Sequence, residues 1–317
     1  MKPWTTWTAT CLILCSIGFM PLHTSAVDNV DGTSLTQVTE PSKAASPAPD
    51  STDITDLARN ASFGTTISKW QSTLAKEKGF EGWTGAKWNS YPLGPGTHGW
   101  VILLSDQGHE VGYMIVHATE SGDFRLTEYG TGSSPLFSLS TLYRSLVQQE
   151  LIPSTNLFED FVRNKNIQLD RLYAGTLTSV WKITLDNVSY YLDAKSGELL
   201  PLTEDPKPHA TSEIVKGTEL SDSALTITRP SFDPYEMLPW IQGTPLPVTS
   251  LAELQVAFDQ NEDLTYVINL YDNQVTMPLA ILGFQQWAHG DTYLTLDHEG
   301  PRYVRLDETL GFGSVYP

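Results

Sequence analysis

Apolar positions spaced by three and four residues predict helices in three places. The pattern Ile67, Trp70, Leu74 puts one apolar face on a helix over Thr66–Lys78. A serine able to cap a helix precedes each of the other two patterns. These are Ser138, followed by Leu139, Leu142, Tyr143, Leu146 and Val147, and Ser250, followed by Leu251, Leu254 and Phe258 in a helix over Leu251–Gln260.

Alternating or continuous apolar runs predict strands, and short turns rich in Gly, Asp and Asn separate them. Seven such runs lie before residue 203: Gly99–Leu104, Val111–Ala118, Phe124–Tyr129, Gln168–Ala174, Ser179–Leu185, Val188–Ala194 and Glu198–Leu202. Four more form two hairpins near the C-terminus: Leu264–Tyr271 with Gln274–Pro278, and Thr292–Leu296 with Tyr303–Leu306.

This order of elements predicts an α+β fold. A helix followed by an antiparallel three-stranded meander occurs twice, and both copies contain Ala followed by a Ser-Gly-acid turn, at Ala118–Asp123 and at Ala194–Glu198. We interpret this as a duplication, with chance similarity of two turns as the alternative. A small mainly-β C-terminal domain follows.

Changes in amino-acid composition along the chain predict where its domains and linkers lie. The segment 27–52 is rich in Ser, Thr, Pro and Asp and is typical of a disordered linker. We therefore predict an α+β domain over 53–202, a second linker over 203–224 and the mainly-β domain over 225–317. Each domain is long enough to fold with its own core.

The first 26 residues have the order of a secretory signal peptide. Lys2 precedes an apolar run from Ala9 to Leu22, and Thr24-Ser25-Ala26 supplies small residues for cleavage. A retained N-terminal anchor is the alternative. Cleavage after Ala26 would remove both cysteines of the chain, so we expect no disulfide, thiolate metal site or cysteine nucleophile. We expect a bacterial protein that is secreted, extracellular or associated with the cell envelope.

The net charge of the chain limits the classes of molecule that it can bind. The chain has 19 Lys and Arg against 37 Asp and Glu, a net charge of −18. Such an acidic protein repels phosphate backbones, which argues against nucleic acid as a partner. The sequence also predicts no membrane span in the mature chain.

One segment resembles a known family. A tryptophan-bearing strand, Val180–Thr184, is followed by a hairpin in which aromatic, Asp-Ala and Gly-Glu positions are filled by Tyr191, Asp193, Ala194, Gly197 and Glu198. This pattern, together with Trp181, resembles the PepSY (peptidase-propeptide-like) module of secreted bacterial proteins, mainly over residues 178–202. The resemblance implies a module that binds or restrains a peptidase and that has no shared catalytic residues. The C-terminal segment resembles no family in this way.

The histidines and acids of the sequence do not have the spacing of a catalytic or metal-binding motif. His109 and His117 lie about 26 Å apart on a straight strand, too far to share a metal. A denser group, His289, Asp291, Asp297, His298 and Glu299, would place Asp291 and Asp297 at opposite ends of one strand. We predict no catalytic residue, no metal and no cofactor.

Aromatic residues suggest a binding surface instead. Trp83, Trp88, Tyr91 and Trp100 bracket a loop rich in Gly and Pro and could together hold a peptide or a cell-wall glycan. The alternative is that they plug the end of a sheet. In the hairpin, Tyr191 and Asp193 are further candidate binding residues, and Asp193 and Glu198 should be solvated. Trp181 should instead anchor the core.

These observations favour a secreted, non-enzymatic protein-binding module that offers a sheet face or edge to a peptidase or another envelope component. The first alternative is a cell-envelope hydrolase that uses the acids of Asp291–Glu299. The second is a purely structural surface protein.

Overall fold

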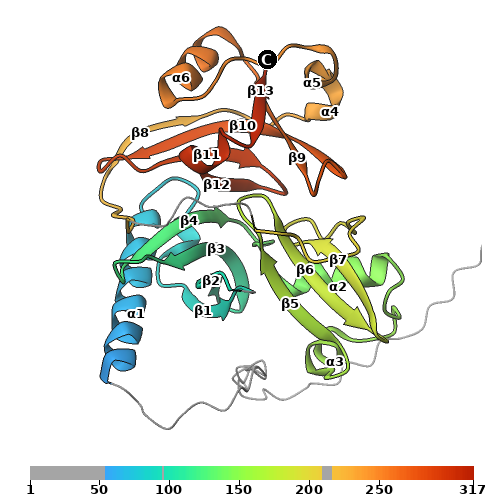
Figure 1. The fold of residues 1–317 in the computed structure, drawn as a ribbon. Helices are drawn as coiled ribbons and strands as arrows, with labels where there is room; N and C mark the ends of the chain where they lie inside the picture. The colour runs from blue at the N-terminus through green and yellow to red at the C-terminus, as the bar shows by residue number, and fades with distance from the viewer. Residues whose placement is uncertain (1–53, 95, 209–215) are drawn as a thin grey trace, which may run out of the picture. The chain divides into compact units, whose positions relative to one another are not determined.

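A computed structural model describes residues 54–94, 96–208 and 216–317 (Figure 1). All described residues belong to one compact unit. The predicted signal peptide, 1–26, and the linker, 27–52, lie outside the described residues. The fold mixes helices with antiparallel sheet, at 38% strand and 21% helix, so the sheets set the architecture.

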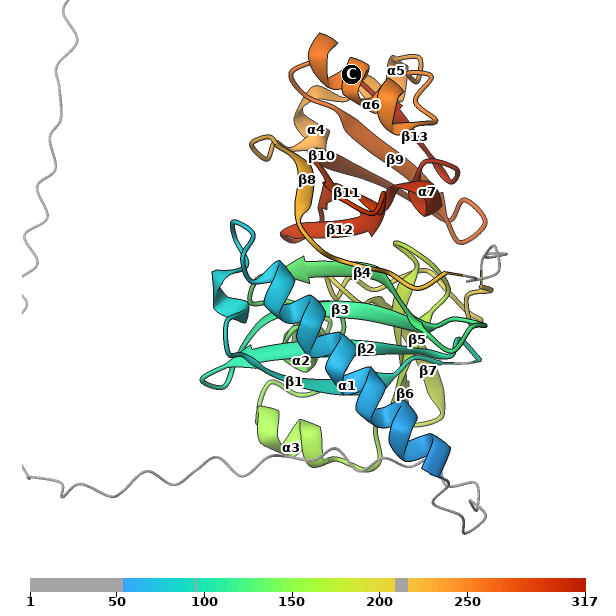
Figure 2. The ribbon, with the colours of Figure 1, turned by 90° about the vertical axis from the view of Figure 1, so that its left-hand side faces the viewer.

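The first helix, α1, runs from Ile54 to Leu74 and lies across one face of strands β1 to β4 (Figure 2). It begins and ends earlier than the predicted 66–78. Ile67, Trp70 and Leu74 form its buried face, as their spacing predicts, and pack on a core that also contains Leu104. After the helix ends, Gly79 adopts a φ of 91°, a conformation that favours glycine.

The strands under α1 form an antiparallel meander. They are β1 (Lys87–Pro92), β2 (Gly99–Asp106), β3 (His109–Ala118) and β4 (Phe124–Thr131), and the short helix η1 (Glu81–Trp83) precedes them. Three of the four strands were predicted. The sequence missed β1 because its exposed positions are Lys, Asn and Ser, which weaken the apolar signal.

A second meander follows two helices. The helices are α2 (Leu139–Gln148) and α3 (Phe158–Arg163), and the strands are β5 (Gln168–Tyr173), β6 (Ser179–Leu185) and β7 (Val188–Asp193). The three strands make a separate antiparallel sheet. The Ser138 hydroxyl accepts a hydrogen bond from the Thr141 amide, which confirms the predicted cap of α2. Trp181 on β6 is 1% exposed, so it is the core residue that the sequence predicted.

The remaining chain is mainly strand. Its elements are β8 (Ser223–Thr228), α4 (Pro234–Met237), α5 (Pro239–Gln242), α6 (Leu251–Gln260), β9 (Thr265–Leu270), β10 (Val275–Trp287), β11 (Thr292–Asp297), β12 (Pro301–Arg305), α7 (Leu306–Thr309) and β13 (Gly313–Tyr316). The helix α6 has the predicted bounds and the predicted Ser250 cap. Strand β10 is longer than predicted. It pairs with β9 over its first half and with β11 and β8 over its second, and a bulge between Ile281 and Gly283 separates the two halves.

The first meander and the C-terminal strands belong to one sheet. β4 pairs antiparallel with β12, with Tyr129 opposite Tyr303, which gives the order β1-β2-β3-β4-β12-β11-β10-β9-β13, with β8 added on β10. The sheet therefore contains strands from both sides of the segment 203–224, where the sequence predicts a linker. In the described part of the chain, no helix is long and apolar enough to cross a membrane.

Candidate functional site

The aromatic residues of the predicted binding surface do not lie together. Trp83 is 0% exposed, and its indole N–H donates to the Val111 carbonyl at 3.0 Å. Trp83 therefore fits the alternative drawn from the sequence, in which these residues plug the end of a sheet. Trp83 packs between Phe80 and the sheet, because the short helix η1 turns it inward.

The other three aromatic residues divide between two faces of the first meander. Trp88 and Trp100 are half-buried and pack against Phe63 of α1, with ring centroids 6.3 and 5.1 Å away. Tyr91 lies three positions after Trp88 on β1 and so points to the other face. There the Arg171 guanidinium lies 4.4 Å from its ring centroid. These residues mostly serve packing, the alternative that the sequence left open.

The predicted residues of the hairpin are also buried. Tyr191 is 3% exposed and donates its hydroxyl to Asp205 at 2.8 Å, and Lys182 reaches the same carboxylate at 2.6 Å. Asp193 is 2% exposed, so the expectation that it would be solvated is wrong, whereas Glu198 is exposed as predicted.

Asp193 can be buried because its own turn supplies the hydrogen bonds that water would otherwise donate to its carboxylate. Its Oδ1 accepts hydrogen bonds from the amides of Lys195 and Ser196, at 2.9 and 2.7 Å, and from the Ser196 hydroxyl at 3.1 Å. Gly197 has a φ of 78°, the left-handed conformation that glycine adopts readily in a tight hairpin. The Asp-Ala-Lys-Ser-Gly segment is thus a turn held by hydrogen bonds between its own residues.

A charged network that the sequence did not reveal lies where β4 meets β12. Glu128 and Arg302 are both 0% exposed and form a two-pronged ion pair, with Nε to Oε1 at 2.9 Å and Nη2 to Oε2 at 3.1 Å. Tyr113 donates its hydroxyl to the same carboxylate. A two-pronged pair of this kind is strong when every remaining donor and acceptor is also satisfied.

His298 extends this network toward the hairpin. Its Nδ1 lies 2.8 Å from Nη1 of Arg302, and its Nε2 lies 3.6 Å from Oδ1 of Asp193. Because Arg302 is a donor, Nδ1 accepts and the proton of the neutral ring is on Nε2. Burial, which Asp193 opposes, lowers the pKa of His298 to about 4.

Lys195 completes the network with backbone partners. Its Nζ donates to the carbonyls of Ser134, at 2.5 Å, and Glu299, at 2.9 Å. Burial, and then the neighbouring Arg302, lower its pKa to about 8. We name these five residues, Glu128, Asp193, Lys195, His298 and Arg302, the buried charge network. It joins the first meander, the hairpin of the second and the C-terminal strands.

The acids of the predicted hydrolase alternative are separated, as expected. Asp291 and Asp297 flank β11 at its two ends, and each has its own partner. Asp291 accepts from Arg305 at 2.7 Å, whereas Asp297 accepts from the Ser231 hydroxyl and from the Gly300 amide at 3.1 Å. Among the described residues, no three His, Cys, Asp or Glu side chains are gathered closely enough to hold a metal ion.

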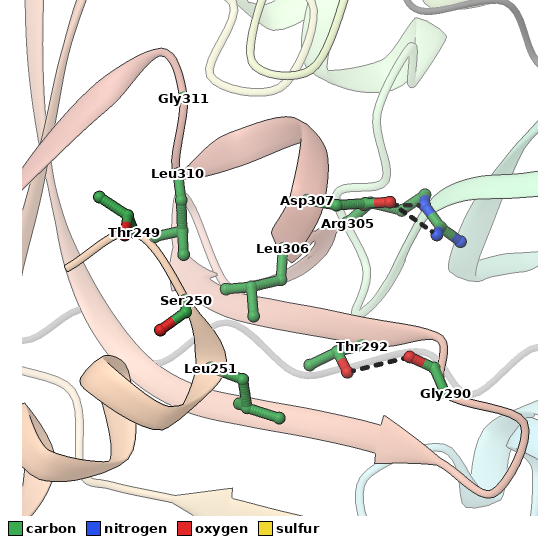
Figure 3. A pocket seen from close by; sticks show the side chains of 10 residues that line it. All are labelled: Thr249, Ser250, Leu251, Gly290, Thr292, Arg305, Leu306, Asp307, Leu310 and Gly311. Carbon is green, nitrogen blue, oxygen red and sulfur yellow. Dashed lines mark hydrogen bonds and ion pairs between the residues drawn. The ribbon is translucent and has the colours of Figure 1, made fainter.

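A cavity of about 430 Å3 lies at the end of the C-terminal core (Figure 3). It is lined by the start of α6, by the turn before β11 with the first residue of that strand, and by α7 with Arg305 before it and the two residues after it. Its apolar side chains are Leu251, Leu306 and Leu310, and hydroxyl groups of Thr249, Ser250 and Thr292 surround them. This volume falls in the range of small-ligand sites.

Arg305 and Asp307 form the charged side of the cavity. Nε and Nη2 of Arg305 donate to the two oxygens of Asp307, at 3.1 and 3.0 Å, and its Nη1 donates to Asp291. The Arg305 side chain is 7% exposed, but that of Asp307 is 60% exposed. Asp307 is therefore the charged group of the cavity that water reaches.

Comparison of the chain with protein-family models, with curated proteins and with solved structures finds no match.

Proposed function

We propose that this is an exported, non-enzymatic protein that binds another protein, either a peptidase or a component of the cell envelope. In this proposal, the two meanders are copies of a PepSY-like unit and the C-terminal strands form a mainly-β unit joined to the first copy. The order helix, then antiparallel meander, in both α1 with β2–β4 and α2 with β5–β7 supports the duplication.

The observation that carries the proposal is that the candidate catalytic side chains lie apart and already have hydrogen-bond or ion-pair partners. A hydrolase would gather carboxylates in a concave site open to substrate, with at least one free to take or give a proton. Here Asp291 is held by Arg305, Asp297 by Ser231 and Gly300, and His298 is 8% exposed between Arg302 and Asp193. This separation supports binding rather than hydrolysis.

The Ser250 hydroxyl beside the cavity also has hydrogen-bond partners within the protein. Its Oγ accepts from the Glu253 amide at 3.3 Å and donates to the Glu253 carboxylate at 3.1 Å, the reciprocal cap of α6. No histidine is among the ten residues that line the cavity. A serine in this setting lacks the base that would make it a nucleophile.

The test is capture of the full chain with its partner. Tagged full-length protein is expressed in its own host and recovered from the culture medium and from the envelope fraction. We expect one protein to co-purify in a fixed ratio and to rebind when both components are pure. If that partner is a peptidase, its turnover of a casein substrate should fall when the chain is added.

Two results would overturn the proposal. One is recovery of the chain without any bound protein from both fractions. The other is release of sugars or peptides from purified cell wall by the chain alone, provided that the Asp291→Asn or Asp297→Asn variant loses this activity while remaining folded. That second result would establish the hydrolase alternative.

A further inference from the structure

The cavity at α6, β11 and α7 can be assigned a ligand class by elimination. None of its ten lining residues is aromatic, so it lacks the ring surface on which a sugar would stack. Arg305 is the one lining residue with a positive charge, and Asp291 and Asp307 accept from each of its three nitrogen atoms. A phosphate or carboxylate ligand would find no uncommitted cation there.

The apolar part of the cavity fits an aliphatic side chain. Leu306 belongs to the C-terminal core, and Leu251 and Leu310 pack on that core while remaining partly exposed. In Figure 3 the three leucines surround one space beside Ser250. A ligand that covers them removes apolar surface from water, a gain of about 25 cal/mol per Å2.

The charge around the cavity favours a basic ligand. Among the described residues, Asp291, Asp307 and Glu308 pair with two guanidinium groups, those of Arg125 and Arg305, so the three acids carry one more charge than their partners. Each oxygen of Asp307 accepts one hydrogen bond from Arg305, and a carboxylate oxygen can accept a second. The excess of acids over the whole chain would attract the same class of ligand.

We infer that this cavity binds a peptide segment in which an aliphatic side chain is flanked by Lys or Arg, the aliphatic group lying on the three leucines and the basic group at Asp307. The inference rests on the proposed protein-binding function and names the feature of the partner that is recognised. It assigns recognition to the C-terminal strands rather than to the aromatic residues of the first meander.

The test uses fluorescence polarisation with the full chain and labelled peptides. The probe is Gly-Lys-Leu-Lys-Gly, and its matched forms replace Leu by Ala or both Lys by Glu. We expect each replacement to weaken binding at least tenfold, and binding of the probe to weaken as salt rises. Equal binding of all three peptides would overturn the inference. Because these arms use the unaltered protein, they do not depend on how any variant folds.

Variants locate the site. Leu310→Ala should weaken binding of the probe at least tenfold, whereas Leu246→Ala, which alters an equally half-buried leucine on the same core but outside the cavity, should not. Asp307→Asn should weaken binding severalfold and flatten its salt dependence. Its control is Asp272→Asn, an exposed acid on the turn between β9 and β10. Thermal melts establish that each variant is folded.

The outcomes separate the two proposals. If the probe binds and Leu310→Ala has no effect, the protein binds peptides elsewhere and the cavity assignment is wrong. If none of the peptides binds while the full chain still captures a partner, the protein-binding function stands and the ligand class is wrong. If neither peptide nor partner binds, both proposals fail.

Discussion

The buried charge network predicts a specific loss of stability in acid. In the folded protein the pKa of His298 is lowered from 6.5 to about 4 by burial, against the pull of Asp193, with Arg302 and Lys195 disfavouring a further positive charge. Between these two pH values the unfolded chain binds a proton at this ring that the folded chain does not. Stability from this group is therefore complete above pH 6.5 and is lost as the pH falls toward 4.

The size of the effect follows from the shift. The fall of the His298 pKa from 6.5 to about 4 corresponds to about 3 kcal/mol, a large part of the 5–15 kcal/mol that holds a typical domain together. His298→Gln keeps an acceptor for Arg302 and a donor for Asp193 but does not titrate. Between pH 7 and pH 4, we expect the free energy of unfolding of the variant to fall by about 3 kcal/mol less than that of the parent protein.

Urea unfolding followed by tryptophan fluorescence at pH 7, 6, 5 and 4 measures this difference. The control is His109→Gln, which changes an exposed histidine at the start of β3 and should leave the pH dependence as it is in the parent. His117 is a second contributor, because burial and then Arg125 lower its pKa to about 4 as well. If parent and His298→Gln lose equal stability over this range, the reasoning about the network is refuted.

Three further predictions concern stability, each measured by urea unfolding. Trp181→Ala should cost about 3–5 kcal/mol, because its indole is fully buried in the second meander. Gly283→Val should unpair β8, since a Cβ there would lie 1.9 Å from the Ile227 carbonyl oxygen, whereas Gly311→Val, with open space around it, should be nearly neutral. Asp193→Ala should cost about 1–3 kcal/mol by leaving buried amides of its turn without an acceptor, and a loss below 0.5 kcal/mol would contradict the turn's role.

The parts of the fold that the sequence predicted are those decided by neighbours along the chain. Ser250 caps α6 three residues before Glu253, and β6 and α6 have the predicted bounds because their apolar spacing is uninterrupted. Strand β8 was missed, because its pairing depends on Gly283, some sixty positions later, allowing its backbone to approach.

The candidate sites were harder to predict, for the same reason. Glu128 and Arg302 lie 174 positions apart, and nothing local marks them as partners. The available signal was weak, because β4 contains Arg125 as well as Glu128, and β12 contains Arg305 as well as Arg302. Asp193 was singled out for its turn, but whether a turn is exposed depends on what packs over it, here His298.

The pairing of β4 with β12 also has a consequence for the order of folding. Residues 132–300 must be synthesised before β12 can pair, which takes about 10–30 s at ordinary rates of translation. During that interval the edge of β4 has unpaired backbone groups, and Glu128 has no guanidinium beside it. Contacts this distant in sequence also close slowly once the chain is complete. The first meander therefore completes its pairing only after β12 has been made, although it is itself made first, and the nascent chain gives chaperones a window of many seconds in which to bind.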